Sequence, residues 1–266
     1  MKLRQGYLLP IIACSLLFAS CTNNEPLENH SKAAAPAHWD YTNTDWAGEG
    51  YSECGGMIQS PINIATASTI KTVLPDVKFN YSDFPISIID NGHSIQVNPN
   101  ANGTKNTITY NGNVYELKQF HFHAAAEHRI DRVQPPMELH LVHKNEQSGA
   151  IVVIGLLIEE GPTDNPFIDK VWKNIPQEKG KEVATTDNIN MNDILPASKL
   201  YYTYTGSLTI PPCSQGLNWI VMKEKIKLSA AQIHKFTAIY SNNTRVVQPL
   251  NNRLVYEDIE PVVKKK

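Results

Sequence analysis

Two closely spaced histidines stand in an alternating segment, Gln119-Phe120-His121-Phe122-His123. On a β-strand, side chains two residues apart share a face, so His121 and His123 point together while the phenylalanines point to the opposite face. A third histidine, His140, stands in a second alternating segment, residues 138–143. Three neutral imidazoles leave one position of a tetrahedral zinc ion open for water, which is typical of a catalytic site. The sequence therefore predicts that His121, His123 and His140 bind Zn²⁺.

Polar residues beside two of these histidines have the chemistry to orient them. A metal-binding histidine usually donates its second ring N–H to a nearby acceptor, which sets the tautomer and the ring orientation. Gln119 lies two residues before His121, and Glu138 lies two residues before His140. We expect Gln119 and Glu138 to be these acceptors.

The segments that position these residues are typical of β-structure. Short β-branched or alternating segments recur between Asn- and Gly-rich turns, at residues 86–89, 94–98, 107–110, 116–123, 138–143, 151–158 and 217–221. Two segments are predicted to be helical, residues 163–174 and residues 229–240, the second beginning at a capping Ser229. We predict one mainly β (α+β) domain, with a large sheet and peripheral short helices.

Composition excludes several classes of protein. The 266 residues include 24 Lys+Arg and 26 Asp+Glu, for a formal net charge of −2, and 41% are hydrophobic. Such a chain has enough apolar surface to fold, which excludes general disorder. The near-neutral charge argues against nucleic-acid binding, which needs a basic face. No HExxH, GxSxG or phosphate-loop motif indicates another catalytic class.

The first residues resemble an export signal. Lys2 and Arg4 precede an apolar run over residues 8–19, which is too short to span a bilayer. Small residues before Cys21 resemble the lipobox of bacterial lipoproteins, in which that cysteine is lipidated; an ordinary cleaved signal is the alternative. We predict a signal peptide (1–20), a flexible tether (21–37), one domain (38–262) and a basic tail (263–266). The expected location is the periplasm, or the outer membrane or cell surface, with membrane contact only through the lipid.

Export also bears on the two cysteines of the domain, Cys54 and Cys213. Outside the cytoplasm a disulfide persists. A bridge between these cysteines would close a loop of about 160 residues and stabilise the fold by roughly 5 kcal/mol. Two free thiols are the alternative.

The motifs taken together resemble the α-class carbonic anhydrases. They occur in the family's order across about residues 38–260, and comprise HWxY (38–41), QSPINI (59–64), NGH (91–93), QFHFH (119–123), EH (127–128), ELHLVH (138–143), SLTIPPC (207–213), NWIV (218–221) and QPLNNR (248–253). The resemblance implies a central, twisted, mostly antiparallel sheet of about ten strands. It also implies zinc-dependent, reversible hydration of carbon dioxide to bicarbonate and a proton.

The resemblance further implies a role for individual residues. Thr209 and Glu127 would orient the zinc-bound hydroxide that attacks carbon dioxide, and His93 would carry the released proton to solvent. The substrate pocket would be lined by Val142, Val153, Leu208, Ile210 and Trp219, the water network would include Tyr41, Asn91 and Gln96, and Cys54 would be bonded to Cys213.

Ile210 departs from the family pattern, because a second threonine usually follows the position of Thr209. We expect this loss of a hydroxyl group to change the affinity for bicarbonate or inhibitory anions. Two other functions stay open: a catalytically silent carbonic-anhydrase-like binding module, and an esterase that uses the same zinc hydroxide. Bacterial relatives are often dimers, so a homodimer is possible.

Overall fold

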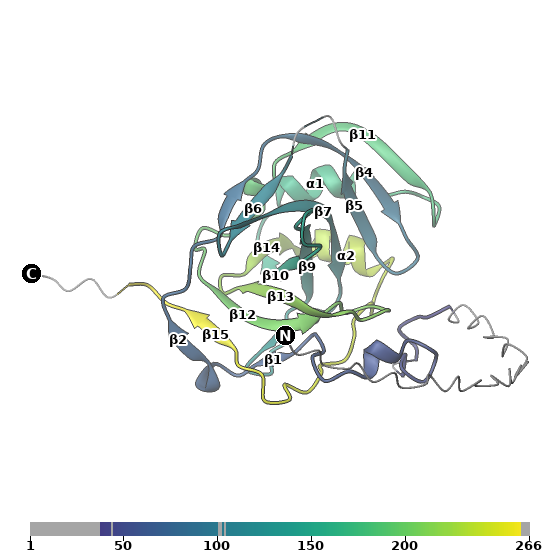
Figure 1. Cartoon of the computed structure of the whole chain (residues 1–266). Coiled ribbons are helices and arrows are strands. Elements are labelled where there is room, and N and C mark those ends of the chain that lie inside the picture. Colours follow the sequence, from purple (N-terminus) through teal and green to yellow (C-terminus); the bar gives the residue numbers. More distant parts are fainter. Residues whose placement is uncertain (1–37, 44, 101–102, 104, 262–266) are drawn as a thin grey trace, which may run out of the picture. The chain divides into compact units, whose positions relative to one another are not determined.

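The structure, a computed structural model, describes residues 38–43, 45–100, 103 and 105–261. The predicted signal peptide (1–20), the tether with Cys21 (21–37) and the basic tail (263–266) therefore lie outside the described residues. A 13-stranded sheet dominates the described part (Figure 1). Ten strands follow one path, in the order β11 (Glu182–Ile189), β4 (Phe84–Asp90), β5 (Ile95–Pro99), β7 (Asn113–His123), β9 (Met137–Lys144), β10 (Ile151–Gly161), β13 (Gln215–Met222), β12 (Tyr201–Ser207), β15 (Tyr256–Asp258) and β2 (Ile70–Thr72).

The remaining strands are short. β14 (Ile226–Ser229) pairs with β10, and β6 (Thr107–Tyr110) joins β3 (Lys78–Asn80) to β7, while β1 (Asn63–Ile64) and β8 (Arg129–Ile130) form a separate two-stranded sheet. In the large sheet, β10 runs parallel to β13 and β14, and β15 runs parallel to β2; its other pairs are antiparallel. The predicted mainly β domain, with a mostly antiparallel sheet of about ten strands, is confirmed.

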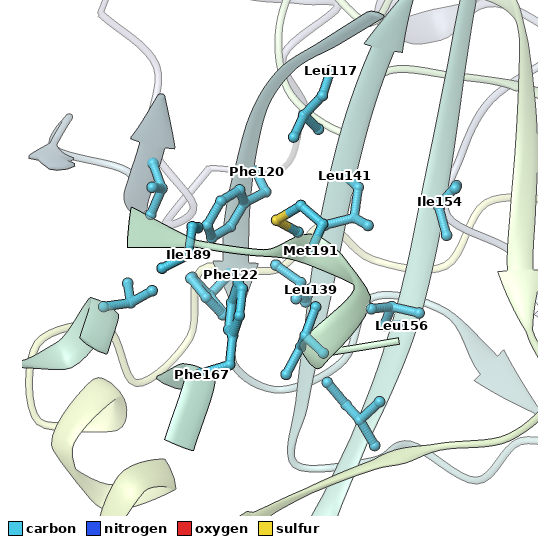
Figure 2. Packing of buried hydrophobic residues seen from close by; sticks show 14 of the residues in the cluster. Leu117, Phe120, Phe122, Leu139, Leu141, Ile154, Leu156, Phe167, Ile189 and Met191 are labelled. Atoms are coloured by element: carbon cyan, nitrogen blue, oxygen red, sulfur yellow. The ribbon is translucent and has the colours of Figure 1, made fainter. Parts of the chain in front are cut away.

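The main core lies on one face of the central strands. Alternating residues of β7, β9 and β10 are fully buried on this face and interdigitate with residues from other elements (Figure 2), including Phe120, Phe122, Leu139, Leu141, Ile154 and Leu156. Because side chains alternate along a strand, the histidines between these residues point to the opposite face. Burial of the phenylalanines and leucines thus fixes which way the histidines point.

Two short helices accompany the sheet, as predicted. Asn165 caps α1 (Pro166–Trp172), and Ser229 caps α2 (Ala230–Thr237) in a capping box with Gln232. The helices contact each other through Trp172, whose indole N–H donates to the Gln232 carbonyl at 2.9 Å. Among the described residues, no helix has the length and apolar character needed to cross a membrane.

A disulfide joins Cys54, in a short 3₁₀-helix (Ser52–Gly55), to Cys213, which follows β12. The predicted bridge is confirmed, and two free thiols are excluded. The two cysteines are 159 residues apart in sequence. The bridge therefore links the beginning of the domain to the loop that carries Thr209.

Candidate metal centre and active site

The three predicted metal ligands converge at the centre of the sheet. His121 and His123 lie on β7, and the antiparallel register places His121 directly opposite His140 on β9. The ring centroids of the three histidines lie 4.6–5.2 Å apart. One ring nitrogen from each histidine lies within 4.8 Å of those of the other two. Three imidazoles placed in this way could hold one metal ion.

Hydrogen bonds decide which nitrogen of each ring faces the centre. The Nδ1 atom of His121 lies 2.8 Å from Gln119 Oε1, and the Nδ1 atom of His123 lies 2.7 Å from the Asn243 carbonyl oxygen. In His140 it is Nε2 that contacts an acceptor, Glu138 Oε1, at 2.9 Å. Each ring therefore donates from one nitrogen to the protein and keeps the lone pair of the other nitrogen for a metal.

Electrostatics keep these imidazoles in the neutral form that binds metal. Burial lowers the pKa of all three ligands, to about 4 for His123 and well below the usual value for His121. His123 Nε2 is buried and has no hydrogen-bond partner among the described residues. A buried, unpaired lone pair is costly unless something binds it, so the residues present fit a metal ion.

Glu138 forms the base of this centre. Its Oε2 atom accepts the backbone N–H groups of Glu127 and His128, and its Oε1 atom contacts ring nitrogens of His128 and His140 at 2.8 and 2.9 Å. Burial alone would raise the pKa of Glu138, but these two histidines hold it well below its usual range. The carboxylate is therefore ionised. The hydrogen-bond network extends beyond His128, whose Nε2 atom lies 2.6 Å from the Tyr204 hydroxyl oxygen.

Glu127 lies on the other side of the ligands. Its Oε1 atom accepts the backbone N–H of Arg245 at 2.8 Å, and its Oε2 atom faces His123 Nε2 at 3.6 Å. Burial raises the pKa of Glu127 to about 7, against the lowering effects of the His140 charge, of the hydrogen bond from the Arg245 amide and of the nearby Thr209 hydroxyl. Thr209 is itself buried. Thr209, Glu127 and the three ligands thus form one cluster.

The predicted polar residues line a cleft that opens from the ligands. His93 is in this cleft, and the other lining residues are Tyr41, Asn91, Ser94, Gln96, Gln119, His121, His123 and Ile210. The His93 ring stacks on Trp39 with the centroids 3.8 Å apart, and its backbone N–H donates to Asn91 Oδ1. Burial, helped by the charges of His38 and Lys179, lowers the pKa of His93.

The predicted apolar residues are arranged differently. Ile210 lines the cleft, whereas Val153 and Trp219 are buried in a second apolar cluster with Val142 and Leu208 packed against it. The Trp219 ring lies 4.8 Å from the His140 ring. This cluster therefore adjoins the metal ligands as an apolar wall, and only Ile210 of the five borders the open cleft.

Sequence reasoning missed two residues of the site. Asn243 accepts from His123 through its backbone carbonyl and from the Ala124 amide through its side chain, and its amide group donates to the carbonyls of His93 and Phe122. Arg245 holds Glu127 through its backbone N–H. Both contacts depend on main-chain atoms in a loop after α2, and no residue pattern marks such contacts.

Comparison with known proteins agrees with this geometry. Residues 38–259 match the family model described as eukaryotic-type carbonic anhydrase. The chain belongs to the α-class carbonic anhydrases. A carbonic anhydrase of Klebsiella pneumoniae is 41% identical over 225 residues, covering 84% of this chain and 87% of the relative. A carbonic anhydrase of Neisseria gonorrhoeae is 38% identical over 255 residues, covering 93% and 94%.

Solved carbonic anhydrase structures share the fold. The α-carbonic anhydrase of Thermovibrio ammonificans, in a complex with the inhibitor sulfanilamide, superposes with a TM-score of 0.78 at 38% identity and covers 84% of this chain and 100% of its own. As a carbonic anhydrase, the protein hydrates carbon dioxide, and its three-histidine centre is a metal site. The disulfide indicates a compartment outside the reducing cytoplasm.

Proposed function

We propose that this carbonic anhydrase uses Zn²⁺ held by His121, His123 and His140. The observation that carries the proposal is the set of three lone pairs that converge while each opposite nitrogen is engaged by the protein. Three neutral imidazoles suit zinc and leave room for one further ligand. When bound, zinc supplies a Lewis acid that makes water acidic enough to act as a nucleophile near neutral pH.

Thr209 and Glu127 are proposed to orient the nucleophile. Because Glu127 Oε1 is occupied by the Arg245 amide, Oε2 is the oxygen available to the Thr209 hydroxyl. With its proton directed to Glu127, Thr209 can only accept a hydrogen bond from the attacking nucleophile. The nucleophile then turns a lone pair towards carbon dioxide, a positioning effect.

His93 is proposed to move the product proton to solvent. Its lowered pKa keeps the ring unprotonated near neutral pH, so it can accept a proton from water in the cleft. Tyr41, Asn91 and Gln96 line the same cleft and offer polar groups for a water network. His93 would then release the proton at the cleft mouth.

The substrate is proposed to rest against the apolar wall. Carbon dioxide has no net charge or dipole, so the apolar side chains beside His140 can hold it without strong hydrogen bonds, namely Val142, Val153, Leu208 and Trp219. Ile210, the residue after Thr209, lines the cleft and provides no hydroxyl for bicarbonate or another anion.

Anchoring and assembly complete the proposal. Cys21 follows an apolar run and small residues, which supports lipidation of that cysteine and a tether over residues 21–37 that links the membrane to the domain at 38–262. Mass spectrometry of the membrane fraction tests the lipid. A homodimer is proposed on the family resemblance alone, and sedimentation of the purified domain tests it.

The test of the zinc proposal compares metal content with activity. The purified mature protein is expected to contain one zinc per chain, to lose carbon dioxide hydration when a chelator removes the zinc, and to regain it when zinc is restored. Full activity after complete zinc removal would contradict the proposal. Absence of carbon dioxide hydration in the zinc-loaded protein would favour the silent binding module. Ester hydrolysis that exceeds carbon dioxide hydration would favour the esterase.

A further inference from the structure

Arg245 has a buried guanidinium group that the proposed reaction does not use. The residue is 6% exposed, and its guanidinium carbon lies 5.3 Å from the ring centre of the buried Trp46. It forms no ion pair with any carboxylate among the described residues, although burying a charge without a partner is costly. A guanidinium buried in this way needs other hydrogen-bond acceptors to compensate for the loss of water.

The acceptors of this guanidinium all belong to one segment near the disulfide. Nη1 donates to Gln59 Oε1 at 2.7 Å and to the Ser60 carbonyl at 2.8 Å, and Nη2 donates to the Cys54 carbonyl at 2.9 Å. Gln59 is held in turn, because its Nε2 atom donates to the Glu53 carbonyl at 2.9 Å. The side chain of Arg245 is therefore fixed to residues 53–60.

The backbone of the same residue contacts the active site. The Arg245 N–H donates to Glu127 Oε1 at 2.8 Å, and Glu127 is fully buried beside the metal ligands. Since the side chain is held at several points, the backbone N–H has little freedom to move away from the carboxylate. Fixing Oε1 determines where Oε2, the oxygen proposed to accept from Thr209, can lie.

We propose that Arg245 is a positioning residue for Glu127, and that its guanidinium, bound to Cys54, Gln59 and Ser60, holds its own backbone N–H on the carboxylate. The inference rests on the proposed role of Glu127 and Thr209. Lysine at this position keeps the charge but has a single nitrogen in place of the planar fork, so it cannot reproduce the set of contacts. Loss of these contacts allows the 245 backbone to shift, and the Thr209 hydroxyl loses its fixed direction.

Arg253 offers a matched control. Its guanidinium also donates to three carbonyls, those of Leu250, Thr205 and Pro249, and lies 5.5 Å from an aromatic ring, that of Tyr204. No hydrogen bond connects Arg253 to Glu127. Arg253→Lys therefore measures the general cost of losing such an arginine.

The test is a double-mutant cycle on the zinc-loaded enzyme. Arg245→Lys is expected to lower kcat/KM for carbon dioxide hydration by about tenfold to a hundredfold, the range that misplacement by an ångström costs. Zinc content should be unchanged, and Arg253→Lys should stay within about twofold of the parent. In a Glu127→Gln background, Arg245→Lys should have no further effect, because the two residues act as one unit. In the metal-free protein, the amide proton at position 245 should exchange faster with solvent in the lysine variant.

The outcomes separate this inference from the proposed function. If Glu127→Gln lowers kcat/KM but Arg245→Lys does not, the positioning role of Arg245 is wrong and the role of Glu127 stands. The same holds if the loss of kcat/KM in the double variant equals the product of the losses in the two single variants. If Glu127→Gln itself retains the parent kcat/KM, both are wrong. Should Arg245→Lys fail to fold, Gln59→Met removes one acceptor of the same guanidinium, and the same non-additivity with Glu127→Gln is expected.

Discussion

Gly155 makes room for the carboxylate that orients His140. It lies on β10 directly opposite His140 in the antiparallel register with β9. A Cβ atom at this position would lie 2.9 Å from Glu138 Oε1, closer than real Cβ contacts come, and 3.7 Å from Trp219. Glu138 is fully buried and accepts four hydrogen bonds, so it cannot turn aside freely. In Gly155→Ala, either the carboxylate or the strand must move, and the 2.9 Å contact with His140 is lost.

The expected loss of zinc affinity follows from the role of the hydrogen bond between Glu138 and His140. Losing the acceptor of a metal-binding histidine typically costs about 10- to 100-fold in metal affinity, which corresponds to about 1.4–2.8 kcal/mol of binding free energy. Competition with a chelator is expected to show a zinc dissociation constant raised by this factor in Gly155→Ala. Gly161→Ala is the control: Gly161 also lies on β10, but its Cβ would meet Lys227 of β14 at 2.8 Å, and it lies four residues beyond Leu157, the residue opposite Glu138. If both variants bind zinc as tightly as the parent, the orienting role of Glu138 is refuted.

Three further predictions concern pH, proton transfer and anions. Burial lowers the pKa of His143 to about 3, so between pH 6.5 and 3 this residue is protonated in the unfolded chain but not in the folded chain. Its contribution to stability is therefore complete above pH 6.5 and is lost as the pH falls, by up to about 1.4 kcal/mol per pH unit. The free energy of unfolding of zinc-loaded His143→Gln, measured with denaturant at a series of pH values, should fall less steeply with decreasing pH than that of the parent, by this amount. A pH dependence equal to the parent's would contradict the assignment. His93→Ala should lower kcat in dilute buffer and be rescued by imidazole, whereas an unchanged rate would reject His93 as the proton carrier. Ile210→Thr should alter inhibition by bicarbonate and other anions, and identical inhibition constants would show that the missing hydroxyl is irrelevant.

The histidine pair on β7 could be predicted because the period of a strand is short-range. Alternation alone placed His121 and His123 on one face, with the phenylalanines facing the core, and the structure has this arrangement. The pairing of β7 with β9 depends on a long-range register, which includes an irregularity between Leu117 and Gln119. The position of His140 opposite His121 therefore required the family resemblance or the structure.

Other parts of the site have no signature in a single sequence. Asn243 and Arg245 contact His123 and Glu127 mainly through backbone atoms, which every residue type possesses. Gly155 is equally inconspicuous, because a glycine within a strand predicts a bulge as readily as it predicts space for a buried carboxylate. The roles of these residues depend on contacts between segments distant in sequence, so they can be identified only from the tertiary structure.

His121, His123 and His140 converge as the metal site of a carbonic anhydrase, the site at which carbon dioxide would be hydrated. The most direct test of this role is the hydration rate per bound zinc in His140→Ala, with His143→Gln, a change on the same strand outside the ligand set, as the control. We expect His140→Ala to lose zinc and carbon dioxide hydration together, and His143→Gln to retain both. Parent-level hydration by His140→Ala, with or without bound zinc, would contradict this role.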